Sequence, residues 1–308
     1  MKNYLITGGC GFIGQHLAKA LSDKKLHVDI IDLPNKIRKK NILNSKYIKY
    51  YNCDIAKPKS LNKFKKKYTC AFHLAAQTSS RLSEKNPLLD IKTNIIGSNN
   101  FCTWARKFKP DRIVFTSSMS VYGRIANFVD EREKCNPISI YGMSKYYSEK
   151  IFERLKNEGF NVTIFRLFNI YGPGQDLKNL NQGMFSIYMA QAIKNRKINV
   201  TGSLNRYRDF VYISDTVNAL LKKPKKKNNW ILNLGTGKKT KVKKVINLIK
   251  NISQINNLKV VEKKSFHEDT WGSYANNYKL RSEGWTPKVN LKLGAELTIK
   301  HVAKNKLF

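Results

Sequence analysis

The stretch "YLITGGCGFIGQHLAKAL", Tyr4 to Leu21, decides the fold. An apolar strand pattern ends at Thr7, and an amphipathic helix pattern follows a turn that is rich in glycine. The turn carries its glycines in the spacings GxGxxG and TGxxGxxG, at Gly8, Gly9, Gly11 and Gly14. Backbone without Cβ atoms approaches a pyrophosphate closely, and the positive end of the following helix attracts its charge. The stretch therefore predicts a dinucleotide-binding strand, turn and helix.

An acidic residue stands where such a unit requires one. "HVDIID" reads as the next strand, and it ends at Asp32, 18 residues past Gly14. A carboxylate there accepts hydrogen bonds from the adenosine ribose hydroxyls and repels a 2′-phosphate, so NAD is favoured over NADP. The cations Lys36, Arg38 and Lys39 lie nearby and keep NADP open as an alternative.

Strand and helix patterns alternate through the first half of the chain. The strand-like runs are "NYLITGG", "HVDIIDL", "CAFHLAA", "RIVFTSS" and "VTIFRLFN". Helical patterns lie near 12–22, 87–108 and 141–158, and Gly159 is a plausible C-cap of the last. This alternation predicts an α/β fold with a doubly wound parallel sheet and helices on both faces.

The pattern changes after about Phe168, where the polar, glycine-rich run "YGPGQDLKNLNQG" begins. We expect a dinucleotide-binding domain over 1–168 and a smaller α/β substrate lobe over 169–308. The segment at about 208–222 could return to the first sheet.

The composition is strongly basic, with a formal net charge of +37 over 308 residues. Lysine supplies most of this charge in many short dispersed runs, which favours a compositional bias over a nucleic-acid partner. The five cysteines are odd in number and include no CxxC, and no histidine pair has HExxH spacing. We therefore expect a reducing, cytoplasmic location and no metal site. No run is apolar and long enough for a signal peptide or a membrane span.

Several motifs share one order with a known family. "TGGCGFIG", "HLAAQ", "FTSSMSVYG", "YGMSK", "RLFNIYGPGQ", "RDFVYISD" and "EGWTPK" follow one another along the chain. This order resembles the extended short-chain dehydrogenases/reductases, the NAD-dependent sugar epimerase/dehydratase family. The resemblance implies a Rossmann domain that holds NAD and a lobe that holds a nucleoside-diphosphate sugar. It also implies a homodimer formed through the helix that bears YxxxK.

The resemblance assigns roles to individual positions. The catalytic residues it implies are Ser118, Tyr141 and Lys145. The cofactor-binding residues, besides Tyr141 and Lys145, are Gly8, Gly11, Phe12, Ile13, Gly14, Asp32, Asp54, Ile55, Leu74, Ala75, Ala76 and Asn94. The substrate-binding residues are Ser118, Asn169, Arg208 and Asp269. Asn94 and Ala76 also fit purely structural positions, and Arg208 could instead form an ion pair with Asp209.

Tyr141 cannot act as a base through Lys145 alone. Moving a phenol from a pKa of ~10 to near 7 takes about 4 kcal/mol. An exposed ammonium at i+4 supplies ~0.5 kcal/mol, and burial raises the pKa of a phenol. The rest of the free energy needed to lower the pKa of Tyr141 requires a partly desolvated Lys145 and the positive charge of the oxidised nicotinamide ring.

The residues before Val121 indicate which reaction follows. Dehydratases and decarboxylases of the family carry acidic residues there, whereas this chain has Ser118, Met119 and Ser120. The resemblance therefore implies a nucleotide-sugar 4-epimerase. In this reaction Tyr141 takes the C4 hydroxyl proton, and the transient 4-keto sugar rotates to present its other face before it is reduced. A dehydratase, a 4-ketoreductase and a catalytically silent NAD-binding regulator remain alternatives.

One departure concerns the diphosphate. Many epimerases have an arginine three residues before the aspartate that aligns with Asp269, and here Phe266 occupies that place. Lys263 or Lys264 could replace it, which leaves the nucleotide base open.

Overall fold

The computed structural model describes residues 2–37, 43–125, 127–178, 183–226, 228–265 and 270–305. The chain divides into two compact units, each built from several segments. Unit 1 comprises Met1–Val121, Ser139–Arg166 and Lys223–Leu232. Unit 2 comprises Tyr122–Ile138, Leu167–Lys222 and Asn233–Phe308.

A seven-stranded sheet organises unit 1, with strand order β12-β7-β5-β4-β1-β2-β3 among the described residues. Its strands are β1 (Asn3–Thr7), β2 (His27–Asp32), β3 (Ile48–Asn52), β4 (Cys70–His73), β5 (Ile113–Ser118), β7 (Val162–Leu167) and β12 (Ile231–Leu234). The pairs from β3 through β5 are parallel, with Tyr4 opposite both Val28 and Cys70. The order reverses between β1 and β4, and such a switch point is where doubly wound sheets bind ligands.

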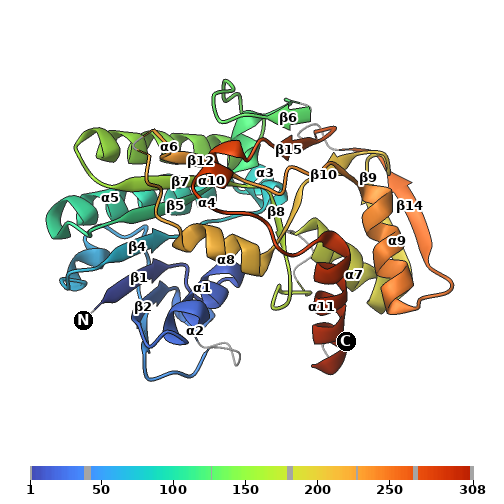
Figure 1. Cartoon of the computed structure of the whole chain (residues 1–308), viewed down its shortest axis with the longest axis horizontal. Coiled ribbons are helices and arrows are strands. Elements are labelled where there is room, and N and C mark those ends of the chain that lie inside the picture. Colours follow the sequence, from blue (N-terminus) through green and yellow to red (C-terminus); the bar gives the residue numbers. More distant parts are fainter. Residues whose placement is uncertain are drawn as a thin grey trace. The chain divides into compact units, whose positions relative to one another are not determined.

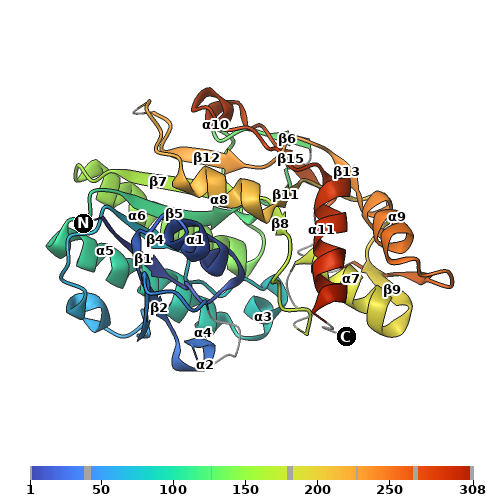
Figure 2. The same ribbon diagram turned by 60° about the horizontal axis from the view of Figure 1, so that its bottom comes forward.

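Helices cover both faces of this sheet (Figures 1 and 2). They are α1 (Phe12–Ser22), α2 (Pro34–Ile37), α3 (Ser80–Lys85), α4 (Pro87–Asp90), α5 (Gly97–Phe108) and α6 (Ile140–Asn157), with 3₁₀ turns η1 (Ser60–Lys63) and η3 (Met119–Tyr122). Under α5 and α6 the core is aromatic, and Phe115 stacks on Phe152 with ring centroids 4.3 Å apart. The predicted doubly wound fold is confirmed.

The helix expected over 87–108 is divided into three consecutive segments. A π-helical segment, η2 (Ile91–Ile96), lies between α4 and α5. Within it, the Asn94 carbonyl accepts a hydrogen bond from Ser148 Oγ on α6 at 2.9 Å. A π turn inside a helix is frequent at functional sites, and here it sets the side chain of Asn94 into the interior.

Unit 2 consists of small sheets and a group of helices. Its strand pairs are β8 (Asn169–Tyr171) with β11 (Phe210–Tyr212), β9 (Lys197–Thr201) with β14 (Lys259–Lys263), β10 (Tyr207–Arg208) with β13 (Thr240–Lys241), and β6 (Asn127–Val129) with β15 (Ser273–Ala275). Its helices are α7 (Met184–Asn195), α8 (Ile213–Leu221), α9 (Val242–Ser253), α10 (Tyr278–Ser282) and α11 (Leu291–Lys304). Helices α7, α9 and α11 lie side by side (Figures 1 and 2).

The path of the chain differs from the expected return of about 208–222 to the first sheet. Strand β11 pairs with β8, whereas β12 is the later strand that joins the seven-stranded sheet. The backbone amide of Ile164 on β7 donates to the carbonyl of Trp230, immediately before β12, at 2.6 Å. Within the described part of the chain, no helix is long and apolar enough to cross a membrane.

Candidate active site

The glycine turn lies at the switch point of the sheet, after β1. Gly8 has φ +69°, and its amide donates to the Ile31 carbonyl at 2.8 Å. Gly11 is the N-cap of α1 and lacks a side chain that would occupy the first amides of the helix. A Cβ on Gly14 would lie 2.6 Å from the Gly8 carbonyl oxygen. The turn therefore leaves a space that side chains would fill. This space lies at the positive end of the eleven-residue helix α1. These residues fit a dinucleotide pyrophosphate.

We expect Gly8→Ala to weaken NAD binding at least about tenfold, or ~1.4 kcal/mol. The new Cβ would lie 2.6 Å from both the amide nitrogen and the Cα of Ala75, in a left-handed backbone conformation. Isothermal titration with NAD measures the effect. Gly159→Ala is the matched control, because Gly159 has φ +94° but has no neighbouring atom within 4 Å of a built Cβ. Equal NAD affinities of the two variants would contradict the prediction.

Asp32 is joined to the glycine turn. Its carboxylate accepts from the Cys10 amide and from the Leu33 amide, each at 2.9 Å. Burial raises its pKa, and these two hydrogen bonds and Lys36 oppose that shift. Arg38 and Lys39, on which the NADP alternative partly rested, lie outside the described residues. Asp54 follows β3, and its Oδ1 accepts from the Ala56 amide at 2.9 Å.

The loop after β4, Leu74 to Gln77, is fixed from two sides. The Ala75 amide donates to Thr7 Oγ1 at 3.3 Å, and that hydroxyl also bonds His73 Nδ1 at 2.8 Å. Asn94 binds the Gln77 backbone twice, accepting from its amide at 2.8 Å and donating to its carbonyl at 3.1 Å. Asn94 thus braces the loop that carries Ala75 and Ala76. Direct cofactor contacts of these three residues stay predictions.

The three residues expected to be catalytic meet in unit 1. Ser118 ends β5, and Tyr141 and Lys145 lie on the first turns of α6, whose N-cap Ser139 accepts from the Gly142 amide at 3.0 Å. Ser118 lies beside the phenol of Tyr141 and lowers its pKa, while Ser118 Oγ is hydrogen-bonded to Ser120. Lys145 is buried, and its Nζ lies 4.3 Å from the centroid of the Phe115 ring. The i,i+4 pair is therefore an interior feature and not an ordinary helix surface.

The electrostatics of the pair match the sequence argument. Burial raises the pKa of Tyr141 to about 12, although the neighbouring Ser118 opposes this shift. Burial lowers the pKa of Lys145 to about 7, opposed by Glu149 and Asp90. Without a further positive charge the phenol stays protonated at neutral pH. Tyr141 therefore depends on an added cation to become a base.

We expect the free energy of unfolding of the cofactor-free chain to increase as the pH rises above about 7, because of the lowered pKa of Lys145. Its pKa falls from 10.5 to about 7 on folding. Between these values the unfolded chain binds one more proton at this residue than the folded chain, so raising the pH favours folding. Urea unfolding between pH 7 and pH 10 measures the gain. Lys145→Met lacks this contribution, and comparing it with the parent cancels the response of the other lysines. Parallel stability curves for parent and variant would contradict the prediction.

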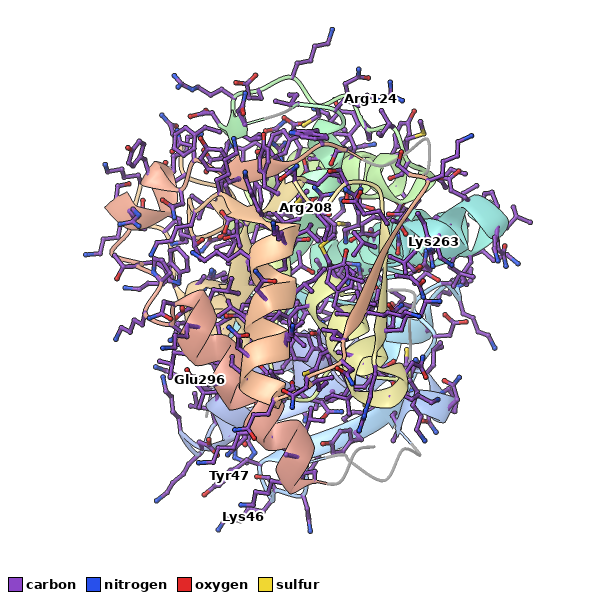
Figure 3. The ribbon with its side chains drawn as sticks, turned by 90° about the vertical axis from the view of Figure 1, so that its right-hand side faces the viewer. Lys46, Tyr47, Arg124, Arg208, Lys263 and Glu296 are labelled. Carbon is purple, nitrogen blue, oxygen red and sulfur yellow. The ribbon has the colours of Figure 1, made fainter. Side chains whose placement is uncertain are left out.

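Two of the residues expected to bind substrate, Asn169 and Arg208, lie close to each other in unit 2. Asn169 donates to the Asp209 carbonyl from its amide and from Nδ2, at 3.0 and 3.1 Å. Arg208, which Figure 3 labels, is buried. It donates to the carbonyls of Tyr207, Trp271 and Thr270. The expected alternative of an Arg208–Asp209 ion pair is not formed. Instead, backbone amides of Thr236, Gly237 and Ala275 donate to the Asp209 carboxylate.

Asp269 and Phe266 lie outside the described residues, so the departure noted there stays a prediction. Lys263 is on the exposed strand β14, where Figure 3 labels it, and Lys264 follows it.

Two groups beside Tyr141 and Lys145 were not predicted. One is Asp90, fully buried at the end of α4. The other is the buried ion pair of Glu149 with Arg166, 2.8 Å apart. The signal in the sequence was spacing: Asp90 precedes Asn94 by four residues, and Glu149 follows Lys145 by four. Charges at one helical turn from a predicted site residue were available as candidates.

Comparison with known proteins agrees with this geometry. Residues 4–235 match the model of the NAD dependent epimerase/dehydratase family. A Methanocaldococcus jannaschii protein that carries the assignment UDP-glucose 4-epimerase is 36% identical over 308 residues, covering 98% of each chain. The UDP-glucuronate 4-epimerase of Thermodesulfobacterium geofontis is 27% identical, covering 99% of this chain and 97% of its own.

A solved structure extends the match to three dimensions. The UDP-glucose 4-epimerase of Thermotoga maritima, solved with UDP-glucose, is 32% identical with a TM-score of 0.92, covering 99% of each chain. The resemblance drawn from the motifs is thereby confirmed, and the cofactor is NAD. The chain belongs to the NAD-dependent epimerase/dehydratase family.

Proposed function

We propose that the chain is an NAD-dependent nucleotide-sugar 4-epimerase that acts on a UDP-hexose, UDP-hexuronate or UDP-N-acetylhexosamine. The observation that carries the proposal is the position of Ser118 beside the Tyr141 phenol, one helical turn from the buried Lys145. The neighbouring group is a second hydroxyl, because Ser118 Oγ and Ser120 Oγ are 3.1 Å apart. Elimination of water or loss of carbon dioxide calls for a carboxylic acid at this place, whereas reversible oxidation does not.

Each residue has one task in this reaction. Bound NAD supplies reversible hydride acceptance at the sugar C4. Tyr141 Oη takes the proton of the C4 hydroxyl, and Ser118 shares that hydrogen bond and orients the hydroxyl. Lys145 stabilises the phenolate and holds the nicotinamide ribose. When the keto sugar presents its other face, Tyr141 returns the proton to the C4 oxygen. The glycine turn, Asp32 and Asp54 hold the remainder of the dinucleotide.

The nucleotide of the substrate is assigned to unit 2. We propose that Asn169, Arg208 and Asp269 hold the diphosphate, as the family resemblance implies. Support comes from the burial of Arg208 next to the carbonyls of Thr270 and Trp271, a desolvated setting in which a guanidinium binds phosphate strongly. Uridine as the base is supported by the names of the relatives.

The function is tested by following sugar nucleotides with ¹H NMR. Purified chain with NAD is incubated separately with UDP-glucose, UDP-glucuronate and UDP-N-acetylglucosamine. We expect at least one to equilibrate with its C4 epimer, with no net formation of NADH. Stoichiometric NADH, or a product that has lost water or carbon dioxide, would point to the alternatives and overturn the proposal.

We also propose that the chain is a homodimer that pairs through α6. The support is an apolar face on unit 1, with an open pocket of about 490 Å³ lined by Ile95, Tyr147, Lys150, Ile151 and Arg154. Beside it Leu88, Ile91 and Met143 are exposed. Such a cluster on one face is typical of a protein–protein interface. A second copy of the chain is the partner we assign.

We expect Tyr147→Glu to convert the dimer to monomer, because it places a charge among these apolar side chains. Size-exclusion chromatography with light scattering measures the mass, against 35.5 kDa for one chain. Tyr278→Glu is the matched control, since Tyr278 is an exposed tyrosine of unit 2. A parent of 35.5 kDa, or a Tyr147→Glu variant that stays dimeric, would contradict the proposal.

We propose a cytoplasmic location, which rests on the cysteines. All five are free, as is usual in a reducing compartment.

A further inference from the structure

We propose that Asp90 is a positioning residue that supplies the buried negative charge of the Tyr141–Lys145 pair. In this role it makes ionisation of Tyr141 conditional on the bound oxidised cofactor. The inference deepens the proposed function and rests on its assignment of Tyr141 as the base.

Asp90 lies where three segments meet: the loop from Leu74 to Gln77, the π-helical segment η2 and helix α6. It is fully buried, and its Oδ2 accepts from Gln77 Nε2 at 2.8 Å. Its Oδ1 accepts from Asn94 Nδ2 at 3.0 Å and from Ser144 Oγ at 3.2 Å. All three donors are neutral, and no ion pair of Asp90 is formed among the described residues. Its charge is therefore held by hydrogen bonds alone.

The same contacts bring Asp90 to the first turns of α6, which carry Tyr141 and Lys145. Ser144 directly precedes Lys145, and its Oγ also lies 2.8 Å from the carbonyl of Tyr141. The π-helical segment begins at the residue after Asp90, and through it Asn94 contacts both Asp90 and Ser144. Asp90 is thus fixed to the turn that carries both Tyr141 and Lys145.

Glu149 also raises the pKa of Lys145, more than Asp90 does, but it has a cation of its own. Glu149 on α6 forms its ion pair with Arg166 on β7. His73 on β4 is neutral, because burial and then Lys145 lower its pKa to about 3. Glu84 on α3 is at an exposed contact, where it accepts from the Ile140 amide. Asp90 is left as the buried carboxylate that acts on this pair without a cation of its own.

The charge of Asp90 has opposite consequences for the two residues. It raises the pKa of Lys145, which favours the ammonium, and it raises the pKa of Tyr141, which opposes the phenolate. Without the cofactor the site therefore holds a protonated phenol, and Lys145 is charged below a pH of about 7. Tyr141 would form the phenolate at neutral pH only when a nearby positive charge, which the oxidised nicotinamide would supply, offsets Asp90.

The first test is the pH profile of kcat/KM in the NAD holoenzyme. Asp90→Asn removes the charge at nearly constant shape. Asp90→Ser removes it without setting an amide against the Gln77 amide, and it serves if Asp90→Asn does not fold. We expect both limbs of the profile to move ~1 unit toward lower pH, because the pKa values of Tyr141 and Lys145 both fall. Ser144→Ala is the control, since it removes a hydrogen bond of the same carboxylate but keeps the charge. Lower activity with an unshifted profile would assign Asp90 a merely structural role and overturn the inference.

The second test needs no enzymatic activity. A double-mutant cycle of Asp90→Asn, or Asp90→Ser if needed, with Lys145→Met is measured by urea unfolding of the cofactor-free chain at pH 6 and pH 9. At pH 6 Lys145 is charged, so we expect loss of Asp90 to lower the unfolding midpoint more in the parent than in Lys145→Met. At pH 9 the folded chain has neutral Lys145, so this difference should disappear. Additive effects at both pH values would overturn the inference. Coupling at pH 6 in a chain without epimerase activity would instead reject the proposed function and leave the electrostatic coupling of Asp90 to Lys145 in place.

Discussion

Tyr141→Phe is expected to lower the rate of C4 interconversion about 10²–10⁴-fold, the usual contribution of a positioned acid–base group. The ring stays in place and only Oη is lost, so the substrate proton loses its acceptor, whereas Ser118 Oγ keeps its contact with Ser120. Cofactor binding should survive, because the glycine turn and Asp32 are unchanged. The measurements are initial rates by ¹H NMR and NAD content after denaturation of the purified variant.

Tyr146→Phe is the matched control on the same helix. Tyr146 follows Lys145 on α6, and its ring contacts are with Tyr147 and Lys150, so we assign its hydroxyl no role in the reaction. We expect parental rates from it. A Tyr141→Phe variant that turns over as fast as Tyr146→Phe would remove Tyr141 from the role of base.

The sequence predicted the fold well, because local patterns encode it. The helix expected at 12–22 is α1, and Asp32 ends β2 as its spacing required. The glycines could be assigned because each reports a backbone constraint, such as the positive φ of Gly8. Constraints of this kind are local, so a single sequence reveals them.

The missing parts of the site depend on contacts between distant segments. Asp90 and Ser144 are 54 positions apart, and no periodicity of either helix joins them. The π-helical segment that sets Asn94 is invisible to a 3.6-residue pattern, so 87–108 reads as one helix. The partners of Arg208 and Asp209 could not be predicted from the sequence either. Adjacent opposite charges suggest an ion pair, whereas the observed partners are carbonyls for Arg208 and amides for Asp209, some of them in other loops.

Glu149→Gln is expected to lower the free energy of unfolding by about 3–5 kcal/mol, as when one partner of a buried ion pair is removed. The side chains of Glu149 and Arg166 are only 4% and 5% exposed, and two hydrogen bonds of 2.9 and 2.8 Å join them. The substitution leaves the Arg166 guanidinium buried without its carboxylate. Urea unfolding measures the loss. Glu153→Gln is the control, because it makes the same change on the same helix in the exposed pair with Lys150, where the effect should be small.

Replacing both partners separates stability from chemistry. Apolar residues of similar volume often match a buried ion pair in stability, so Glu149→Leu with Arg166→Met should recover most of the loss caused by Glu149→Gln. Activity at high pH should not recover, because Glu149 raises the pKa of Lys145 and the double variant lacks it. The basic limb of the pH profile should then move to lower pH in a stable protein. If the double variant regains both stability and the parental basic limb, the ion pair serves only to fasten α6 to β7, and the charge of Lys145 is set by Asp90 and the cofactor.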